Sequence, residues 1–365
     1  MAALLDEIAW EGEPLVPARA DPAWEAEIKR RGGQVSEVDR RIGCSPWLRE
    51  ALLSLTVYRP VAMPLRLFHI GAMVTAQENA CRYCYGANRA YMKILGYPED
   101  FIHRIERDLH MAELDAKEQA FIAFCRSLAR SRPRPARSTV DRLVALGFSR
   151  PAVCEMAFAI ALGCGYNRVS TFLACPPERG FERLANGPIG RIIGLAAPLL
   201  QRLRRPGAAP AADAPLDVAT LERSRFSGVL VPLAGLPAAR IMRDALDGVF
   251  ASTVLGPATK ALMFAVVART LECGLCETQA RSLLAGSKLS GADADAALDN
   301  LHSDLLPRGE VVLLSWSRST VHYDTAAIQR ETRELRASLG EDQLVEAIGV
   351  AALANATVRL AMLHA

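Results

Sequence analysis

A Cys-x-x-Cys sequence occurs twice in this chain, and the interval between the copies constrains the fold more than any other feature. Cys81 and Cys84 enclose the first copy, and Cys273 and Cys276 enclose the second, 192 residues later. Each copy follows an apolar stretch and precedes a segment with helical periodicity. Two thiols at this spacing suit dithiol redox chemistry or metal binding.

Other landmarks recur at nearly the same interval, which indicates that the chain is duplicated. The repeated landmarks, 191 to 193 residues apart, are Pro64 and Pro257, Glu118 and Glu310, Leu146-Gly147 and Leu339-Gly340, and Arg168 and Arg359. Landmarks that keep their order and drift by one residue indicate a repeated unit of domain size. Chance similarity between short apolar helices is the alternative explanation.

Helix signals occupy most of the sequence, so we expect an all-α fold. Ser45-Pro46 is typical of a helix start, Pro64 precedes another helix, and Asp115 and Ser149 are typical capping residues. Alternating strand patterns are scarce. A chain of 365 residues favours about two domains.

The repeat and the composition together predict four segments. An N-terminal extension covers 1–44, and a first helical domain covers 45–186. A linker rich in Pro, Ala and Arg covers 187–215, and a second, degenerate domain covers 216–365. Within the linker, the stretch from Ile189 to Leu203 predicts either a basic amphipathic helix on a membrane surface or a helix packed against a neighbouring domain.

Composition excludes several classes of protein. The net charge is +3 without long runs of Lys or Arg, so we expect no nucleic-acid partner. The N-terminus has no signal-peptide pattern, and the apolar stretch from Pro188 to Leu200 is interrupted by Arg191 and too short to span a bilayer. Nine cysteines argue against a secreted disulfide framework. We therefore expect a cytoplasmic protein without an integral membrane segment.

The residues around the first pair include groups that could handle a proton. If one continuous helix runs through this segment, Glu78 shares a face with Cys81, Cys84 and Asn88. Glu78 could then act as a base, and His69 could reach the same pocket. The alternatives are that Glu78 is a solvated helix residue and His69 a core histidine.

The segment from Glu78 to Asn88 resembles the signature of the carboxymuconolactone decarboxylase and alkylhydroperoxidase D superfamily, Cys-x-x-Cys-x-x-x-His. The downstream order of a Leu-Asp-x-x-Glu helix, a short helix ending in Leu-Gly and a long apolar helix with Asn167-Arg168 is also similar. The resemblance covers most of 45–175 and, more faintly, 235–365. It implies two tandem all-α domains, symmetric assembly as a homo-oligomer, and reduction of hydroperoxides with electrons from a partner protein.

The resemblance also implies roles for single residues. It makes Cys84 the attacking thiolate and Cys81 its resolving partner. The histidine of the signature is replaced by Asn88 in the first copy and Ala280 in the second, and the family's upstream glutamate by His69 and Ala261. We expect Asn88 to act as a hydrogen-bonding substitute. Cys273 and Cys276 are then the remnant of a second site.

The sequence therefore predicts a thiol-disulfide oxidoreductase with peroxidase-type activity and no cofactor. Its expected partners are a small hydroperoxide or other oxidised substrate and a protein thiol or dithiol that donates electrons. Three alternatives remain open. They are a metal site built from the Cys pairs or from the first pair with Glu78 and His69, a decarboxylase-like lyase or isomerase, and a non-catalytic scaffold.

Overall fold

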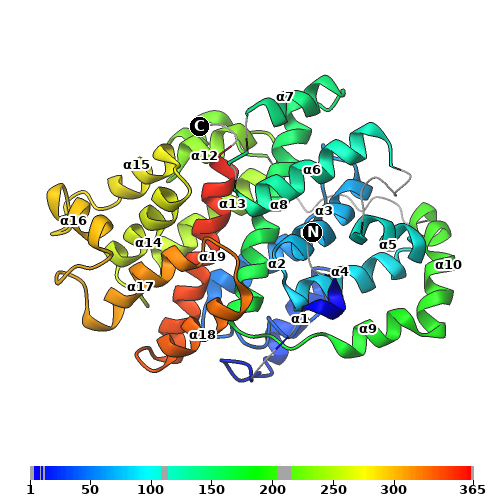
Figure 1. The fold of residues 1–365 in the computed structure, drawn as a ribbon, viewed down its shortest axis with the longest axis horizontal. Helices are drawn as coiled ribbons and strands as arrows, with labels where there is room; N and C mark the ends of the chain where they lie inside the picture. The colour runs from blue at the N-terminus through cyan, green and yellow to red at the C-terminus, as the bar shows by residue number, and fades with distance from the viewer. Residues whose placement is uncertain are drawn as a thin grey trace.

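The computed structural model describes an all-helical protein, shown in Figure 1, so the predicted all-α class is confirmed. The described residues are 4–8, 10, 13–107, 114–132, 134–135, 137–203 and 215–362. No strand occurs among them.

The helices found up to residue 203 are η1 (Leu5–Glu7), α1 (Pro22–Arg30), α2 (Pro46–Thr56), α3 (Leu65–Glu78), α4 (Arg82–Ile94), α5 (Glu99–Arg107), α6 (Ala116–Arg130), α7 (Arg137–Ala145), α8 (Arg150–Phe172), α9 (Arg179–Asn186) and α10 (Pro188–Leu203). The helices from residue 215 onward are α11 (Val218–Glu222), α12 (Ser227–Leu230), η4 (Val231–Leu233), α13 (Pro237–Ala251), α14 (Pro257–Thr270), α15 (Gly274–Ser282), α16 (Ala292–Asn300), α17 (Arg308–Ser319), α18 (Thr325–Arg336) and α19 (Glu341–Ala361). Below, residues 45–186 are called the N-terminal half and residues 216–362 the C-terminal half.

Several helices begin at the capping residues that the sequence indicated. Asp115 accepts a hydrogen bond from Glu118 N at 2.8 Å, and Ser149 accepts one from Ala152 N at 3.3 Å. Ser45 is the N-cap of α2, but its hydroxyl donates to Glu346 Oε2 at 3.4 Å instead of capping the helix. The position of a helix start therefore follows from nearby residues. The partner of the Ser45 hydroxyl does not, because Glu346 lies 301 residues further along the chain.

The two halves contain helices in the same order at nearly constant intervals. The starts of α14, α15 and α17 follow those of α3, α4 and α6 by one and the same interval, which is also the interval between the Cys pairs, and α19 follows α8 by one residue less. The backbone irregularities recur as well. Ala80 (φ 43°) and its counterpart Glu272 (φ 54°) both adopt the left-handed conformation directly before a Cys pair.

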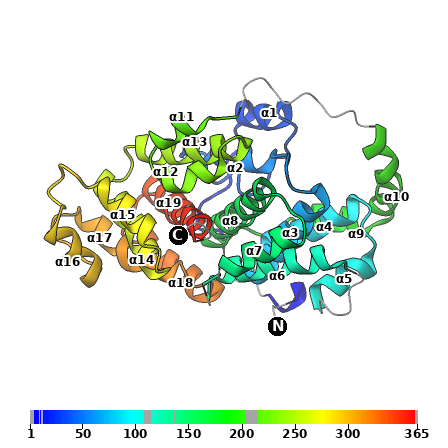
Figure 2. The same ribbon diagram turned by 90° about the horizontal axis from the view of Figure 1, so that it is seen from above.

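Corresponding helices of the two halves pack against each other. The long helices α8 and α19 lie side by side at the centre of the molecule in Figures 1 and 2, and α2 packs on α13. The backbones of α8 and α19 approach each other closely at Gly165. A Cβ atom added to this glycine would lie only 3.2 Å from the Ala352 carbonyl oxygen of α19. Contacts between like elements are the geometry of an isologous, two-fold interface. One continuous buried core spans both halves.

Two buried arginines cross between the halves in a reciprocal manner. Arg168 of α8 donates from Nε to Thr320 O and from Nη2 to Val321 O, both at 3.0 Å, at the C-terminus of α17. Arg359 of α19 donates from Nε to Ala129 O at 3.4 Å, in the last turn of α6. Both side chains are fully buried. Each arginine therefore supplies donors to helix-terminal carbonyls of the opposite half, where the helix dipole favours a cation.

Burial without a carboxylate partner has an electrostatic consequence. Desolvation, followed by repulsion from Arg168, lowers the pKa of Arg359 to about 9. Both guanidinium groups also approach Val321 O, at 3.0 Å for Arg168 and 3.1 Å for Arg359. The carbonyls and the Asn355 side chain, which accepts from Arg359 Nη1 at 2.7 Å, offset this cost.

The segments outside the halves are also partly helical. The first part of the predicted linker forms α10, and its later part, 204–214, lies outside the described residues. The N-terminal extension reaches both halves. Leu15 N donates to Leu173 O at 3.0 Å, and Arg19 forms an ion pair with Glu341 at 2.7 Å.

Among the described residues, α19 is the one helix long and apolar enough to cross a membrane. All of its apolar window is buried inside the protein, against α8 and α14. Its hydrophobicity is therefore used for the protein core.

We predict that Arg168→Ala lowers the free energy of unfolding by about 3 kcal/mol, because buried carbonyls lose their donors. Urea denaturation measures this change. The matched control is Arg183→Ala, an exposed residue whose Nε bonds only the Arg179 carbonyl of its own helix, with an expected change within about 0.5 kcal/mol. Equal destabilisation by both substitutions would contradict the structural role of Arg168.

Candidate functional site

The first Cys pair lies at a sharp junction between α3 and α4. Helix α3 ends in a Schellman motif, in which Cys81 N donates to Ala76 O at 3.0 Å and Ala80 N to Gln77 O at 2.9 Å. Cys81 then becomes the N-cap of α4, and its Sγ accepts from Cys84 N at 3.4 Å. One continuous helix was the condition for a face shared by Glu78 and the thiols, and the structure does not meet it, because the left-handed Ala80 redirects the chain.

The two sulfurs share one hydroxyl partner. Ser170 Oγ of α8 lies 3.2 Å from Cys81 Sγ and 3.1 Å from Cys84 Sγ. Both cysteines are free thiols and nearly fully buried, with 1% and 4% of their surface exposed. The hydroxyl thus lies within hydrogen-bonding distance of both thiols in a site closed to solvent.

The surroundings shift the pKa values of the two thiols in opposite directions. Burial acts to raise the pKa of Cys81, but hydrogen bonds with the Cys84 thiol, Ser170 and the Cys84 backbone outweigh it and lower the pKa to about 7. Burial, together with the hydrogen bond to Cys81, raises the pKa of Cys84 well above its usual value. The environment stabilises the thiolate at Cys81, opposite to the roles implied by the family resemblance.

The C-terminal half completes the surroundings of this pair. The Tyr323 hydroxyl contacts the Thr171 hydroxyl and donates to Asn167 O at 2.8 Å, and burial raises its pKa, so the phenol stays protonated. Thr325 Oγ1 donates to Ala80 O at 3.2 Å, at the left-handed junction. The first thiol pair is therefore enclosed by both halves of the chain.

Glu78 does not lie on the face of the thiols. Its carboxylate, 2% exposed, forms ion pairs with Arg130 Nε at 2.5 Å and Arg126 Nε at 3.3 Å, both on α6. This arrangement follows from the helix break at Ala80, which separates Glu78 at the end of α3 from the cysteines of α4. We expected Glu78 to be either a base beside the thiols or a solvent-exposed helix residue. The structure shows a buried carboxylate paired with two arginines instead.

His69 and Asn88 have other partners. His69 Nδ1 lies 3.2 Å from the Tyr97 hydroxyl, and burial, assisted by Arg59, lowers the histidine pKa to about 4. The neutral ring packs edge-on against Tyr91, as expected for a core histidine. Asn88 Nδ2 donates to Cys84 O at 2.9 Å, within α4, and so contacts the backbone of the pair.

The second Cys pair has the same backbone and different side-chain neighbours. Interaction with the Cys276 thiol is the largest cause that lowers the pKa of Cys273 to about 6, and Arg134 contributes to the shift. The interaction with Cys273 raises the pKa of Cys276. Arg134 Nη1 of the N-terminal half donates to Glu272 O at 2.9 Å, which mirrors the contact of Thr325 with Ala80.

In the part of the chain that the structure describes, no hydroxyl is shared by the two sulfurs of the second pair. At the interval that relates the start of α8 to that of α19, the position of Ser170 is occupied by Ala361. Ala261 and Ala280, at the positions expected to carry proton-transfer groups, are fully buried in the core. The halves differ in their hydrogen-bonding groups, whereas each retains one cysteine of lowered pKa.

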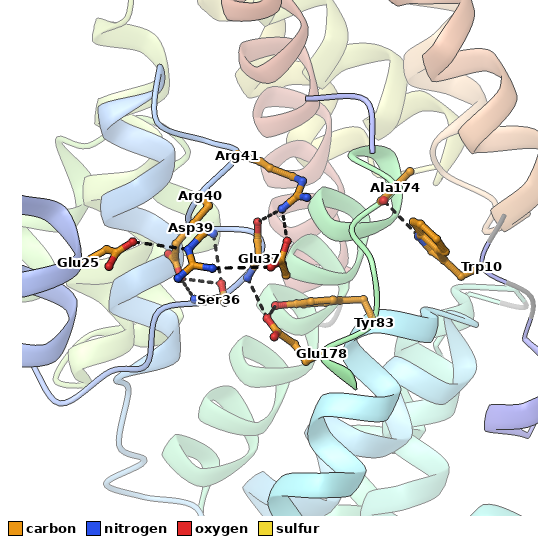
Figure 3. Close-up of polar contacts among 10 residues, drawn as sticks. All are labelled: Trp10, Glu25, Ser36, Glu37, Asp39, Arg40, Arg41, Tyr83, Ala174 and Glu178. Carbon is orange, nitrogen blue, oxygen red and sulfur yellow. Dashed lines mark hydrogen bonds and ion pairs between the residues drawn. The ribbon is translucent and has the colours of Figure 1, made fainter. Parts of the chain in front are cut away.

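The N-terminal extension is linked by hydrogen bonds to residues near the first pair, as Figure 3 shows for Glu37, Tyr83 and Glu178. Glu178 Oε1 accepts from the Tyr83 hydroxyl at 3.0 Å and from Glu37 N at 2.9 Å. The Glu37 carboxylate in turn pairs with Arg41, and Trp10 Nε1 donates to Ala174 O at 3.1 Å. Tyr83, inside the Cys-x-x-Cys sequence, is therefore tied to the extension through Glu178.

Several residues of the site carried no signal in the sequence: Thr171, Ser170, Glu178 and Tyr323. Ser170 lies within a long helix that the apolar pattern predicted, but that pattern does not say which polar residue faces the thiols. Tyr323 reaches the site only through packing of the two halves. A pocket of about 770 Å³ between α14, α17 and α18 contains none of the seven residues proposed from the sequence.

The potential metal ligands do not converge. Glu78 and His69 are engaged elsewhere, as described above. Within the described ranges of the chain, no group of three or more His, Cys, Asp or Glu side chains could hold a metal ion.

No protein-family model, curated protein or solved structure matches this chain.

We predict that alkylation of Cys81 by iodoacetamide rises with pH with a midpoint near 7, since the thiolate is the reactive form. Ser170→Ala removes a hydrogen bond to that thiolate, moves the midpoint to higher pH and lowers the rate at pH 7 roughly fivefold. Peptide mass mapping resolves the cysteines. Cys273, with an expected midpoint near 6, is the internal control and keeps its profile in the variant. An unchanged Cys81 midpoint in Ser170→Ala would contradict this account.

We further predict that Glu78→Gln destabilises the fold by about 2 kcal/mol without altering the alkylation profile of Cys81, because the carboxylate pairs with arginines and not with the thiols. Urea denaturation and the alkylation assay provide the two measurements. A shifted Cys81 profile in a folded variant would restore Glu78 as a proton-transfer residue.

Proposed function

We propose that this protein is a thiol-disulfide oxidoreductase that reduces hydroperoxides through Cys81 and Cys84. The supporting observation is the environment of Cys81, whose sulfur is an N-cap that accepts from Cys84 N and lies beside the Ser170 hydroxyl. The resulting pKa of about 7 makes a large fraction of this thiol nucleophilic near neutral pH. Both Cys pairs contain one thiol of lowered pKa, but only in the first pair does a hydroxyl, that of Ser170, lie near both sulfurs among the described residues.

In the proposed reaction, Cys81 is the nucleophile. Its thiolate attacks the terminal peroxide oxygen, the O–O bond breaks, and the departing alkoxide takes up a proton from solvent, equivalent to the one that Cys81 lost on ionisation, to leave as an alcohol. Cys81 is thereby oxidised to a sulfenic acid. Cys84 then attacks the sulfenic sulfur, which forms the disulfide, and the released hydroxide leaves as water with the proton from Cys84. A protein dithiol supplies two electrons and two protons to restore both thiols.

Ser170 has two roles in this proposal. Its hydroxyl, near both sulfurs, stabilises the Cys81 thiolate before the first step. In the second step the same hydroxyl can accept the proton of Cys84 while it donates its own, so the high-pKa thiol is activated as it attacks. Glu78 and His69 have no part in the mechanism.

Both sulfurs are buried, so a substrate can reach them only after a local movement. The proposal assigns this movement to the segment 13–44, which is connected to Tyr83 because Glu37 N and the Tyr83 hydroxyl both donate to the Glu178 carboxylate. Opening this contact would give a hydroperoxide or a donor dithiol access to Cys81. The expected cytoplasmic location and protein donor belong to this proposal.

The proposal extends to a tandem arrangement of two alkylhydroperoxidase D-like domains that assemble further into a homo-oligomer. The support is the repeated helix order, the recurring left-handed residue before each pair and the reciprocal arginine contacts. The C-terminal pair would then be a former redox site that lost its shared hydroxyl at Ala361.

We predict that wild-type protein consumes cumene hydroperoxide with dithiothreitol as reductant, and that Cys81→Ser reduces turnover at least a hundredfold. With the reductant removed, Cys84→Ser should consume one equivalent of hydroperoxide and accumulate a sulfenic acid at Cys81, detected by dimedone labelling and mass spectrometry. Cys273→Ser is the matched control, with turnover within twofold of wild type. Full turnover by Cys81→Ser would exclude this mechanism, and loss of turnover in Cys273→Ser alone would place the reaction in the other half.

A further inference from the structure

Helix α10 projects an apolar face away from the body of the protein. It lies at the edge of the molecule in Figures 1 and 2, where it packs against α4 and α9. The side of α10 that faces the protein is closely packed at two glycines. A Cβ atom added to Gly194 would lie 2.8 Å from Lys93 O, and one added to Gly190 would lie 2.4 Å from Leu184 O. One side of α10 is therefore packed against α4 and α9, and among the described residues the opposite side has no packed neighbour.

Three large aliphatic side chains occupy the outer side. Ile189, Ile192 and Leu195 are 58%, 66% and 84% exposed, and we call them the α10 face. Their spacing of three residues places them along one side of the helix. Leu195 is more exposed than any other large hydrophobic residue that the structure describes. Such a grouping on one helix differs from the scattered apolar residues of an ordinary surface.

The charges along this stretch of the chain all have one sign. Residues 183–212 contain five arginines and no Asp or Glu. Arg191 is exposed and lies within the α10 face segment, and the acid that precedes the stretch, Glu182, is already paired with Arg82 at 2.8 Å. The apolar face is therefore carried by a positive segment that lacks compensating carboxylates of its own.

This combination selects the partner. Packing the same face of a second copy against it would bring two sets of arginines together without acids between them. A bilayer with anionic headgroups accepts the aliphatic side chains and pairs with the arginines at once. The apolar part, Pro188–Ala197, is too short to span a membrane but long enough to lie in its surface.

We propose that α10 docks the protein on the surface of an anionic phospholipid bilayer. The helix lies in the plane of the interface, with Ile189, Ile192 and Leu195 among the acyl chains and Arg191 at the headgroups. This inference does not depend on the thiol chemistry proposed above. It assigns the first part of the segment between the halves to a peripheral, reversible contact with lipid.

The test is co-sedimentation of the full-length protein with two kinds of vesicle, phosphatidylcholine alone and phosphatidylcholine mixed two to one with phosphatidylglycerol. We expect binding to the anionic vesicles that is weakened by high concentrations of NaCl, and at least tenfold weaker binding to phosphatidylcholine. Leu195→Glu should lower affinity for the anionic vesicles at least tenfold, and Arg191→Gln about fivefold. Leu305→Glu, at a half-exposed leucine between α16 and α17, is the matched control and should bind like wild type.

Circular dichroism and size-exclusion chromatography establish that each variant is folded and report its oligomeric state. Wild-type binding by a folded Leu195→Glu variant, or equal binding to both vesicle types, would overturn the proposal. A wild type that ignores vesicles but self-associates, with Leu195→Glu shifting it to a smaller species, would identify the α10 face as a contact between copies. That result would also overturn the membrane assignment. Hydroperoxide turnover is unaffected in every case, which separates this test from that of the thiol mechanism.

Discussion

The reciprocal burial of Arg168 and Arg359 is the interaction on which the rest of the structure depends. Each guanidinium crosses from a central helix to the carbonyls that end a helix of the opposite half. A buried cation is costly unless its donors are satisfied, so this geometry tolerates little displacement between the halves. Because α8 and α19 carry the two arginines, these contacts fix the register of each central helix against the opposite half.

Local patterns in the sequence were sufficient for the fold class and for much of the helix layout. Proline, serine and aspartate at helix starts act within one turn, which is why Ser149 and Asp115 are found at the predicted caps. The interval between the two Cys pairs likewise corresponds to helices that recur in the same order. The left-handed turn at Ala80, which separates Glu78 from the thiols, was not predictable, because a left-handed alanine has no signature comparable to that of glycine.

The candidate site was predictable only in its sulfurs. Cys81 and Cys84 are adjacent along the chain, so their proximity follows from spacing alone. Glu78 depended on an assumed continuous helix, and Ser170, Thr171 and Tyr323 depend on contacts between distant segments. The proposal of Cys81 as nucleophile also needed the structure, since the hydrogen bond between the two thiols lowers the pKa of Cys81 and raises that of Cys84.

The reciprocal contacts at Ala80 and Glu272 have a consequence for how such a chain can be divided. The carbonyl before each Cys pair receives its donor from the other half, Thr325 in one case and Arg134 in the other. A gene split between the halves would yield two fragments, neither of which contains a finished site. Only their reassociation would restore both contacts, because each half supplies the donor that its counterpart lacks. Covalent linkage guarantees that pairing at equal stoichiometry, and it leaves the two equivalent positions free to diverge in sequence.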